Sequence, residues 1–158
     1  MAIVGAAPTM ENVATLIDPP ASTLDEPRWI GGIVESAGAP LLLDLHNLYA
    51  NAVNFGADPA AMLLRLPLDR VTTVHLSGGH WIDAPGSSER RLLDDHVHDV
   101  PPVVFSLLTL LARETPQPLD VILERDGKFP AFKHLLAQLD AARAALAEGR
   151  AARLKAVA

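Results

Sequence analysis

The sequence predicts an α/β fold with a parallel sheet, of the TIM-barrel (β/α) type but with only about four βα units. Three short apolar segments are typical of buried parallel strands, and helix-like segments lie between them. Each ends on a residue that can bind a metal, at the strand end where α/β proteins place their sites. The segments and the residues that follow them are 40–43 with Asp44, 71–74 with His75, and 119–123 with Glu124.

Four βα units make half of an eight-stranded barrel. A whole barrel typically needs about 250 residues, whereas this chain has 158. We therefore expect a half barrel with two open sheet edges, through which the chain could associate with itself. The alternative is a small doubly wound sheet, but Gly78-Gly79 alone is weak evidence for a phosphate-binding loop.

The helices are identified by their caps and their apolar spacing. Thr23 or Asp25 can cap the first helix, and Asp58 can cap the second, which begins with proline. Proline also starts the third helix, and leucine and alanine recur at helical spacing in the fourth. In chain order we expect a weak strand at 3–11, a helix at 26–36, a strand at 40–44, a helix at 59–66, a strand at 71–75, a helix at 101–113, a strand at 119–124 and a helix at 129–146.

Two polar segments are predicted as loops. Residues 47–56 are rich in asparagine, which favours a structured loop, and residues 77–91 form a long polar stretch of the kind that is functional or mobile in compact domains. We expect one domain, the C-terminal half of a TIM barrel, over residues 1–148. Residues 149–158 are expected to be a flexible tail.

Composition limits the class of protein. Hydrophobic residues make up 49% of the chain, so it is globular, and a net charge of −6 argues against a nucleic-acid-binding protein. The absence of cysteine excludes disulfides and thiolate metal sites. No apolar stretch approaches the roughly 20 residues that span a membrane, so we expect a soluble cytoplasmic protein without membrane contact.

The richest group of chemically active residues is 94–99 (DDHVHD). Alternate residues of an extended segment face the same side, so His96 and His98, or Asp94 and His96, could reach one metal. The alternative is a solvated acidic loop.

Each residue at a strand end also has a structural alternative. Asp44 could cap a helix or pair with a base, His75 could be a satisfied core histidine, and Glu124 could form an ion pair with Arg125. His80 could be a ligand or a mobile base. A donor set of carboxylates and imidazoles suits iron, manganese or zinc, and more than four candidate ligands suggest more than one ion.

Several segments together resemble the multinuclear non-heme iron-dependent oxidases, a family that includes the methanobactin-biosynthesis oxidase. Residues 41–54 (LLLDLHNLYANAVN) resemble one family signature. The other matching segments are 10–12 (MEN) with "LEN", 74–78 (VHLSG) with "IHLAG", 93–100 (LDDHVHDV) with "ID-THGH-PV", and 121–126 (VILERD) with "LIEWD".

The resemblance implies a TIM barrel that binds two or three irons and uses dioxygen to modify cysteine residues of ribosomally made precursor peptides. It also implies a separate partner protein that recruits the peptide. His46 replaces a common asparagine, Asn47 keeps the next one, and His96 and His98 match the loop histidines. The full set of metal residues expected on this basis is Glu11, Asp44, His46, Asn47, His75, Asp94, His96, His98 and Glu124.

The chain also departs from the family pattern. Asp95 replaces a usual threonine and Asp99 a usual proline, and the four strands before the "LEN" strand have no counterpart. We therefore expect a fragment, inactive alone, whose apolar residues Leu41, Leu43 and Val74 face the side of the missing half. Two further readings stay open: a metal-dependent sugar isomerase or endonuclease-like TIM barrel, and a catalytically inactive half barrel that serves as a binding module.

Overall fold

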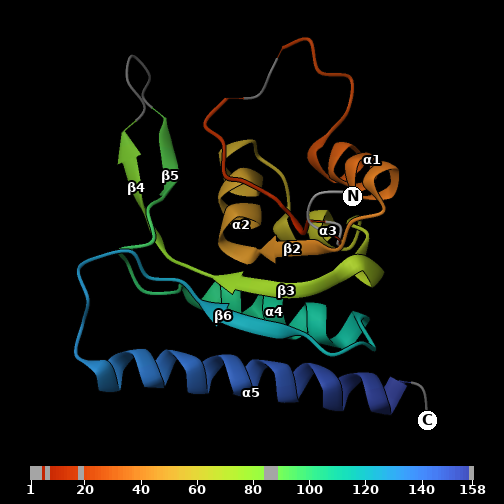
Figure 1. The fold of residues 1–158 in the computed structure, drawn as a ribbon. Helices are drawn as coiled ribbons and strands as arrows, with labels where there is room; N and C mark the ends of the chain where they lie inside the picture. Colours follow the sequence, from red (N-terminus) through yellow and green to blue (C-terminus); the bar gives the residue numbers. More distant parts are fainter. Residues whose placement is uncertain (1–4, 6–7, 18–19, 84–88, 157–158) are drawn as a thin grey trace.

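The computed structural model describes residues 5, 8–17, 20–83 and 89–156. Strands and helices alternate through most of this length (Figure 1). The elements are β1 (Met10–Glu11), α1 (Glu26–Ala37), β2 (Leu41–Asp44), α2 (Leu45–Asn54), α3 (Pro59–Leu63), the 3-10 helix η1 (Leu68–Arg70), β3 (Val71–Leu76), β4 (Gly79–Asp83), β5 (Arg90–Asp94), α4 (Pro102–Glu114), β6 (Asp120–Leu123) and α5 (Phe132–Ala156).

Four strands form one parallel sheet in the order β1-β2-β3-β6. Because every strand runs the same way, their carboxyl ends share one edge, on the side where the β4–β5 hairpin rises in Figure 1. The register places Asp44 beside His75 and Glu11 beside Leu42. The α/β class and the parallel sheet predicted from the sequence are confirmed, and the arrangement is consistent with part of a TIM-type barrel.

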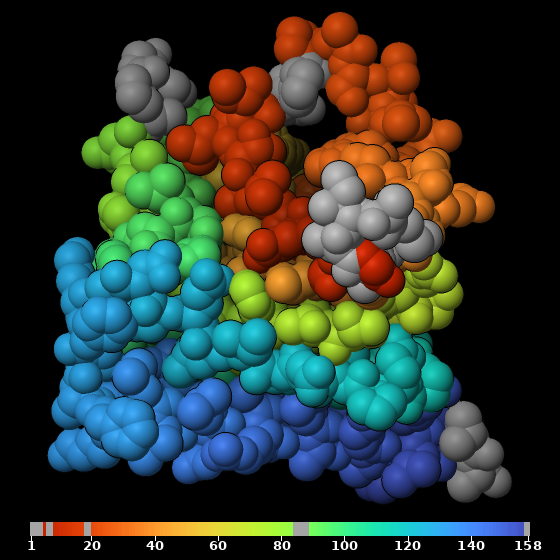
Figure 2. Space-filling model, in the orientation of Figure 1, coloured from red at the N-terminus to blue at the C-terminus, as the bar shows by residue number. Residues whose placement is uncertain are grey.

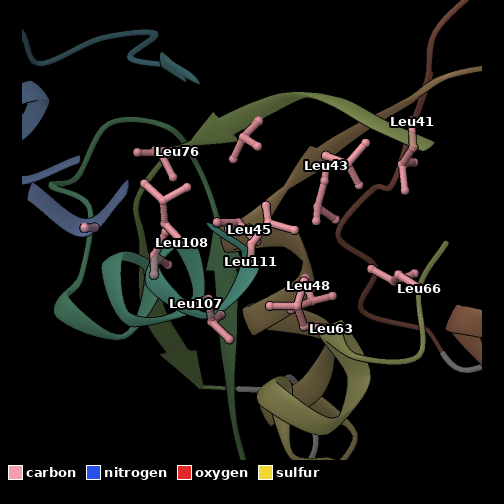
Figure 3. Packing of buried hydrophobic residues seen from close by; sticks show 14 of the residues in the cluster. Leu41, Leu43, Leu45, Leu48, Leu63, Leu66, Leu76, Leu107, Leu108 and Leu111 are labelled. Atoms are coloured by element: carbon pink, nitrogen blue, oxygen red, sulfur yellow. The ribbon is translucent and has the colours of Figure 1, made fainter. Parts of the chain in front are cut away.

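The hydrophobic core lies between the sheet and the helices α2 and α4 (Figure 3). Leu41, Leu43 and Val74 are fully buried in it. The expectation that these three residues face away from the helices is therefore wrong. Side chains alternate across a strand, so the opposite face carries their neighbours, among them Thr73 and the 47% exposed Ile122.

The segment 47–56, predicted as a loop, is mostly helix α2. Asp44 caps this helix by accepting a hydrogen bond from the backbone N–H of Asn47 at 2.7 Å. Asparagine has a poor intrinsic helix propensity, but the buried side chains of Asn51 and Asn54 are held by backbone groups of other segments. Asn54 bonds both the N–H and the C=O of Leu92. Tertiary hydrogen bonds thus override local preference.

The polar stretch 77–91, also predicted as a loop, contains β4 and the start of β5, which pair antiparallel. The prediction failed because charged and polar side chains cover the exposed faces of these strands. Gly79 is required here because a Cβ would meet the carbonyl oxygen of Leu93 at 2.0 Å and the ring of His46 at 2.6 Å. Residues 84–88, which join the strands, lie outside the described part of the chain.

Helix α5 extends to Ala156, past the expected start of a tail at residue 149. Gly149 allows the close approach of α4, because a Cβ there would meet the carbonyl oxygen of Thr109 at 2.3 Å. Arg150 donates hydrogen bonds to the carbonyl oxygens of Thr115 and Gln117. Packing against α4 therefore holds residues 149–156 as helix, a correction to the predicted tail; 157 and 158 lie outside the described residues.

The ends of the other elements shift slightly. Helix α1 has the predicted cap at Asp25 and ends at Gly38 in the left-handed conformation, with φ at 60°. The weak strand expected at 3–11 is described only as β1, since residues 3, 4, 6 and 7 lie outside the described part. Within the described residues, no helix has both the length and the apolar character needed to span a bilayer.

Candidate metal centre

Four side chains of the kinds that can bind a metal meet at the carboxyl edge of the sheet. Each offers one ligand atom, and the four atoms lie within 4.8 Å of one another. The parallel register brings them there, since Asp44 pairs with His75 and the backbone N–H of Glu124 bonds the carbonyl of Leu76 at 2.9 Å. The set, from β1, β2, β3 and the residue after β6, is Glu11, Asp44, His75 and Glu124.

Within this set, several buried atoms face one another without making hydrogen bonds. His75 Nδ1 lies 3.3 Å from Glu11 Oε1 and 3.0 Å from Glu124 Oε2, yet neither His75 Nδ1 nor Glu124 Oε2 has a hydrogen-bond partner. Asp44 Oδ2 is likewise buried without a partner. Buried polar atoms left unpaired cost free energy. Their convergence therefore has the geometry expected around a bound cation.

Asp44 is fully buried and serves two purposes. Its Oδ1 caps α2, and its backbone N–H and C=O pair with the side-chain amide of Asn12 at 2.8 and 2.9 Å. Burial raises the pKa of Asp44 to about 6, although the hydrogen bond from Asn47 acts in the opposite direction. A cation beside Oδ2 would favour the ionised form.

His96 approaches the same edge from the segment after β5. Its Nδ1 lies 3.5 Å from both Glu124 Oε2 and Asp126 Oδ2, and these three side chains form a second group of possible ligands that shares Glu124 with the first. His96 has a φ of 54°, a conformation that non-glycine residues adopt rarely. Backbone hydrogen bonds to Gly78 and Asp126 hold it there.

Asp94 anchors His96 and His46. Its Oδ2 lies 2.6 Å from His96 Nε2, and its Oδ1 lies 2.6 Å from His46 Nδ1 and accepts from Ser77 at 3.1 Å. Burial opposes ionisation of Asp94, but the bonds to the two histidines outweigh it and lower its pKa. Burial acts to lower the pKa of His96, but the nearby charges of Asp94 and Glu124 outweigh it and raise the pKa. Asp94 and His46 thus lie beside the ligand groups.

The remaining expected ligands take different places. Asn47 is buried, donates to the carbonyl of Asn12 at 3.0 Å and leaves its Oδ1 without a partner beside the cavity. His98 does not join the shared edge; it pairs with Asp95, as His80 does. Burial acts to raise the pKa of Asp95, but bonds from Val97, His98 and His80 lower it to about 2.

Two residues with roles in this arrangement were absent from the expected ligand set. Asp126 belongs to the second group of possible ligands. Its signal was its position two residues after Glu124, on the same side of an extended segment. Asn12 fixes the backbone of Asp44, and its signal was its place in the segment 10–12, after a strand-end carboxylate.

A cavity of about 320 Å³ adjoins the ligand groups. The segment after β1 forms one wall, and Figure 2 shows this segment on the front surface between the β4–β5 hairpin and α1. The cavity walls combine apolar side chains with the metal-binding edge. They are Glu11, Val13, Ala14, Thr15, Leu16, Asn47, Leu92, Leu93, Asp94, His96 and Glu124.

Known proteins resemble this chain over most of its length. A UPF0276 protein of Bordetella bronchiseptica is 39% identical over 142 residues, which are 90% of this chain and 48% of that protein. A UPF0276 protein of Caulobacter vibrioides is 33% identical over 141 residues, 89% of this chain and 48% of that protein. A UPF0276 protein of Streptomyces avermitilis is 39% identical over 137 residues, 87% of this chain and 27% of that protein.

This chain spans about half the length of the first two relatives. A family model described as RiPP precursor modification enzyme MbnB/TglH/ChrH matches residues 2–147. That match extends over nearly the whole chain and includes every residue of the metal-binding edge, which confirms the resemblance seen in the sequence. The chain belongs to the MbnB/TglH/ChrH family of RiPP precursor modification enzymes.

Proposed function

We propose that this chain carries the metal centre of an iron-dependent oxidase that uses dioxygen to modify cysteine residues of ribosomally made precursor peptides. One observation carries the proposal: buried, unpaired carboxylate and imidazole atoms converge at the strand ends beside a cavity. The family description supplies the class of substrate. The donor set contains only nitrogen and oxygen, which suits iron, with manganese or zinc as alternatives.

The residues present fit two ions. Glu11, Asp44, His75 and Glu124 would hold one, and His96, Glu124 and Asp126 the other, with Glu124 shared. Two-metal sites commonly place their ions about 3.5–4 Å apart, a spacing that one shared carboxylate can span. A third ion, which the resemblance allows, is not required by these two groups.

When bound, iron would supply thiolate binding and one-electron chemistry with dioxygen. The carboxylates would balance its charge, and Asp94, held by His46 and Ser77, would keep His96 in place. The apolar walls of the cavity, among them Leu92 and Leu93, would exclude water around the peptide side chain.

The substrate and partners belong to the same proposal. A precursor peptide would enter the cavity beside the segment after β1, presented by a separate peptide-recruiting protein. The expected location is the cytoplasm, where such peptides are made. Because the chain spans about half of its Bordetella bronchiseptica relative, the activity, substrate and partner are proposed for the whole protein that this sequence represents.

Metal loading tests the ligand assignment. The chain is loaded with Fe²⁺ without oxygen, freed of unbound metal and measured by elemental analysis. We expect Asp44→Ala to lose most of the iron, because it removes a charged ligand from a buried site. Asp69→Ala, at an exposed aspartate in η1, is the matched control. Equal iron in both variants would remove Asp44 from the ligand set.

Oxygen consumption tests the reaction. The whole protein that this sequence represents is loaded with iron and mixed with a cysteine-containing peptide or with its cysteine-to-serine counterpart. The oxidase proposal expects consumption that depends on the cysteine. Peptide binding without oxygen consumption would instead favour an inactive binding module, and metal-dependent interconversion of sugars would favour the isomerase alternative.

A further inference from the structure

Three side chains outside the proposed metal centre gather at the base of the β4–β5 hairpin. Each of His80, Asp95 and His98 offers one possible ligand atom, and the three atoms lie within 4.8 Å of one another. We propose that this hairpin-base triad is a separate binding site for a divalent transition metal such as Zn²⁺. It shares no residue with the two ligand groups that meet at Glu124.

The fold holds the carboxylate of the triad in a fixed position. Asp95 directly follows β5, and its Oδ1 accepts a hydrogen bond from the backbone N–H of Val97 at 3.0 Å. This bond leaves Oδ2 directed at both imidazoles, 2.7 Å from His80 Nδ1 and 2.8 Å from His98 Nδ1. Both imidazole nitrogens therefore already face one carboxylate oxygen.

The pairing of β4 with β5 brings the two imidazoles together. His80 lies in β4, where it pairs with Leu93, whereas His98 follows β5. Their ring centroids are 4.9 Å apart. The close backbone packing depends on Gly78, because a Cβ there would meet the carbonyl oxygen of His98 at 2.4 Å. The pairing of the hairpin thus builds the site.

The donor set matches a zinc site with an open position. Zinc sites with three protein ligands, such as two imidazoles and one carboxylate, and one water are tetrahedral, with bonds of about 2.0–2.1 Å and ligand atoms therefore roughly 3.3 Å apart. The two distances from Asp95 Oδ2 to the imidazole nitrogens need to lengthen by only about half an ångström to reach that spacing. His80 and His98 are 44% and 39% exposed, so water can complete the coordination.

Metal binding would change the tautomer of both imidazoles. In the metal-free chain the two Nδ1 atoms are placed to donate their protons to Asp95. The metal would take those three atoms as ligands, and each neutral imidazole would then carry its one ring proton on Nε2, which solvent can reach. The consequence would be a cross-link between β4 and the segment that carries Asp94 and His96.

A hydrogen-bonded brace without metal affinity is the competing account, and Co²⁺ distinguishes the two. Tetrahedral Co²⁺ reports nitrogen and oxygen ligation through visible absorption, and Zn²⁺ displaces it. The titration is performed on the Glu124→Gln chain, which removes the carboxylate shared by both ligand groups at the sheet edge and leaves the triad unchanged. We expect one equivalent of Co²⁺ with tetrahedral absorption that Zn²⁺ removes.

Single variants in the same background assign the site. Loss of a residue that only orients a ligand typically costs 10–100-fold in affinity, so loss of a ligand should cost about 100-fold or more. We expect His80→Ala and His98→Ala each to remove the absorption. His134→Ala is the control, because His134 is similarly exposed and pairs with Asp99 outside the triad.

His80 is 44% exposed, so its replacement by alanine should leave the fold intact. Circular dichroism of the variant checks this. Tetrahedral Co²⁺ absorption that persists in folded His80→Ala would overturn the proposal, as would absence of any Co²⁺ or Zn²⁺ binding in the folded parent. Neither result bears on the oxidase proposal, whose test is iron held through Asp44.

Discussion

The two faces of the parallel sheet carry different kinds of side chain and differ in exposure. On the face toward α2 and α4, Leu43, Val74 and Leu76 are completely buried among other apolar side chains. On the opposite face, Ile122 is 47% exposed, and the strand ends carry the candidate metal ligands Glu11, Asp44, His75 and Glu124. The sheet therefore draws its stability from one face and presents its polar chemistry on the other.

The unpaired polar atoms emphasise this difference. Among the described residues, six buried side-chain atoms have no hydrogen-bond partner. One belongs to Glu26, and the others lie at the strand ends and the first turn of α2, on Asp44, His46, Asn47, His75 and Glu124. Five of these six unpaired atoms therefore gather where a ligand can bind.

The largest expected effect comes from the helix-facing side. Leu43→Ala should lower the free energy of unfolding by about 3–5 kcal/mol, because it leaves a cavity in a fully buried cluster. Ile122→Ala, on the opposite face, should cost about 1 kcal/mol or less. Urea unfolding of the metal-free chain measures both. Equal losses would mean that the two faces contribute alike.

The next effect concerns Glu26, a half-buried carboxylate away from the candidate metal centre. Burial raises its pKa to about 7, only partly offset by a 2.8 Å hydrogen bond from Asn51. The folded protein therefore binds this proton more tightly than the unfolded chain does. The stability that the proton provides is complete below about pH 4.5 and is lost as the pH rises through 7.

Glu26→Gln should remove this dependence and raise stability at pH 8 by up to about 3 kcal/mol, since one pKa unit corresponds to about 1.4 kcal/mol. Glutamine can still accept the bond from Asn51. Unfolding at pH 5 and pH 8 measures the effect, with Glu35→Gln at an exposed position of α1 as control. A variant that keeps the wild-type pH slope would show that Glu26 does not titrate in this range.

A smaller effect should follow from Asp44→Asn at the metal centre. Asparagine caps helices as well as aspartate does, while the raised pKa of Asp44 marks a charge that burial disfavours. We expect the metal-free variant to gain about 2 kcal/mol, less than the pKa alone suggests because the carboxylate also favours the helix N-terminus.

The same variant should lose the stabilisation that added Fe²⁺ gives the wild-type chain. Thermal melts with chelator and with Fe²⁺ separate the two effects. A variant that is less stable than wild type without metal would show that the Asp44 charge is satisfied by the protein alone.

The sequence was sufficient for the features that depend on local pattern. Apolar segments ending on Asp44, His75 and Glu124 identify parallel strands and a shared edge, because parallel order alone brings those ends together. Asp58 was predicted as the cap of α3, and Thr23 or Asp25 as the cap of α1; Asp58 and Asp25 accept bonds from the first turns of these helices.

Features that depend on distant partners were not predictable in the same way. The asparagines of α2 become helical because Thr15, Val13 and Leu92 bond them across the fold. Asn47, Asn51 and Asn54 do recur at helical spacing, a signal that their low propensity obscured.

The sequence analysis also placed Leu41, Leu43 and Val74 on the wrong face of the sheet. They lie on the face that the helices cover. A period of two separates the faces of a strand but does not say which face the helices cover. His98 was assigned to the common edge because nothing local indicates that His80 lies opposite Asp95.

The smallest expected effect on stability belongs to Ile122, on β6 at one edge of the described sheet. Ile122→Lys should change the free energy of unfolding by about 0.5 kcal/mol or less, because the side chain is 47% exposed.

The effect of Ile122→Lys on self-association should be larger. An exposed apolar side chain on an edge strand favours pairing with a second chain, and lysine there is a common natural safeguard against it. We expect sedimentation to detect self-association of the wild-type chain, weakened about tenfold by Ile122→Lys and unaffected by Leu154→Lys on the 68% exposed leucine of α5. Equal weakening by both variants would point to charge alone, whereas a monomeric wild-type chain would show that the exposed face needs no partner.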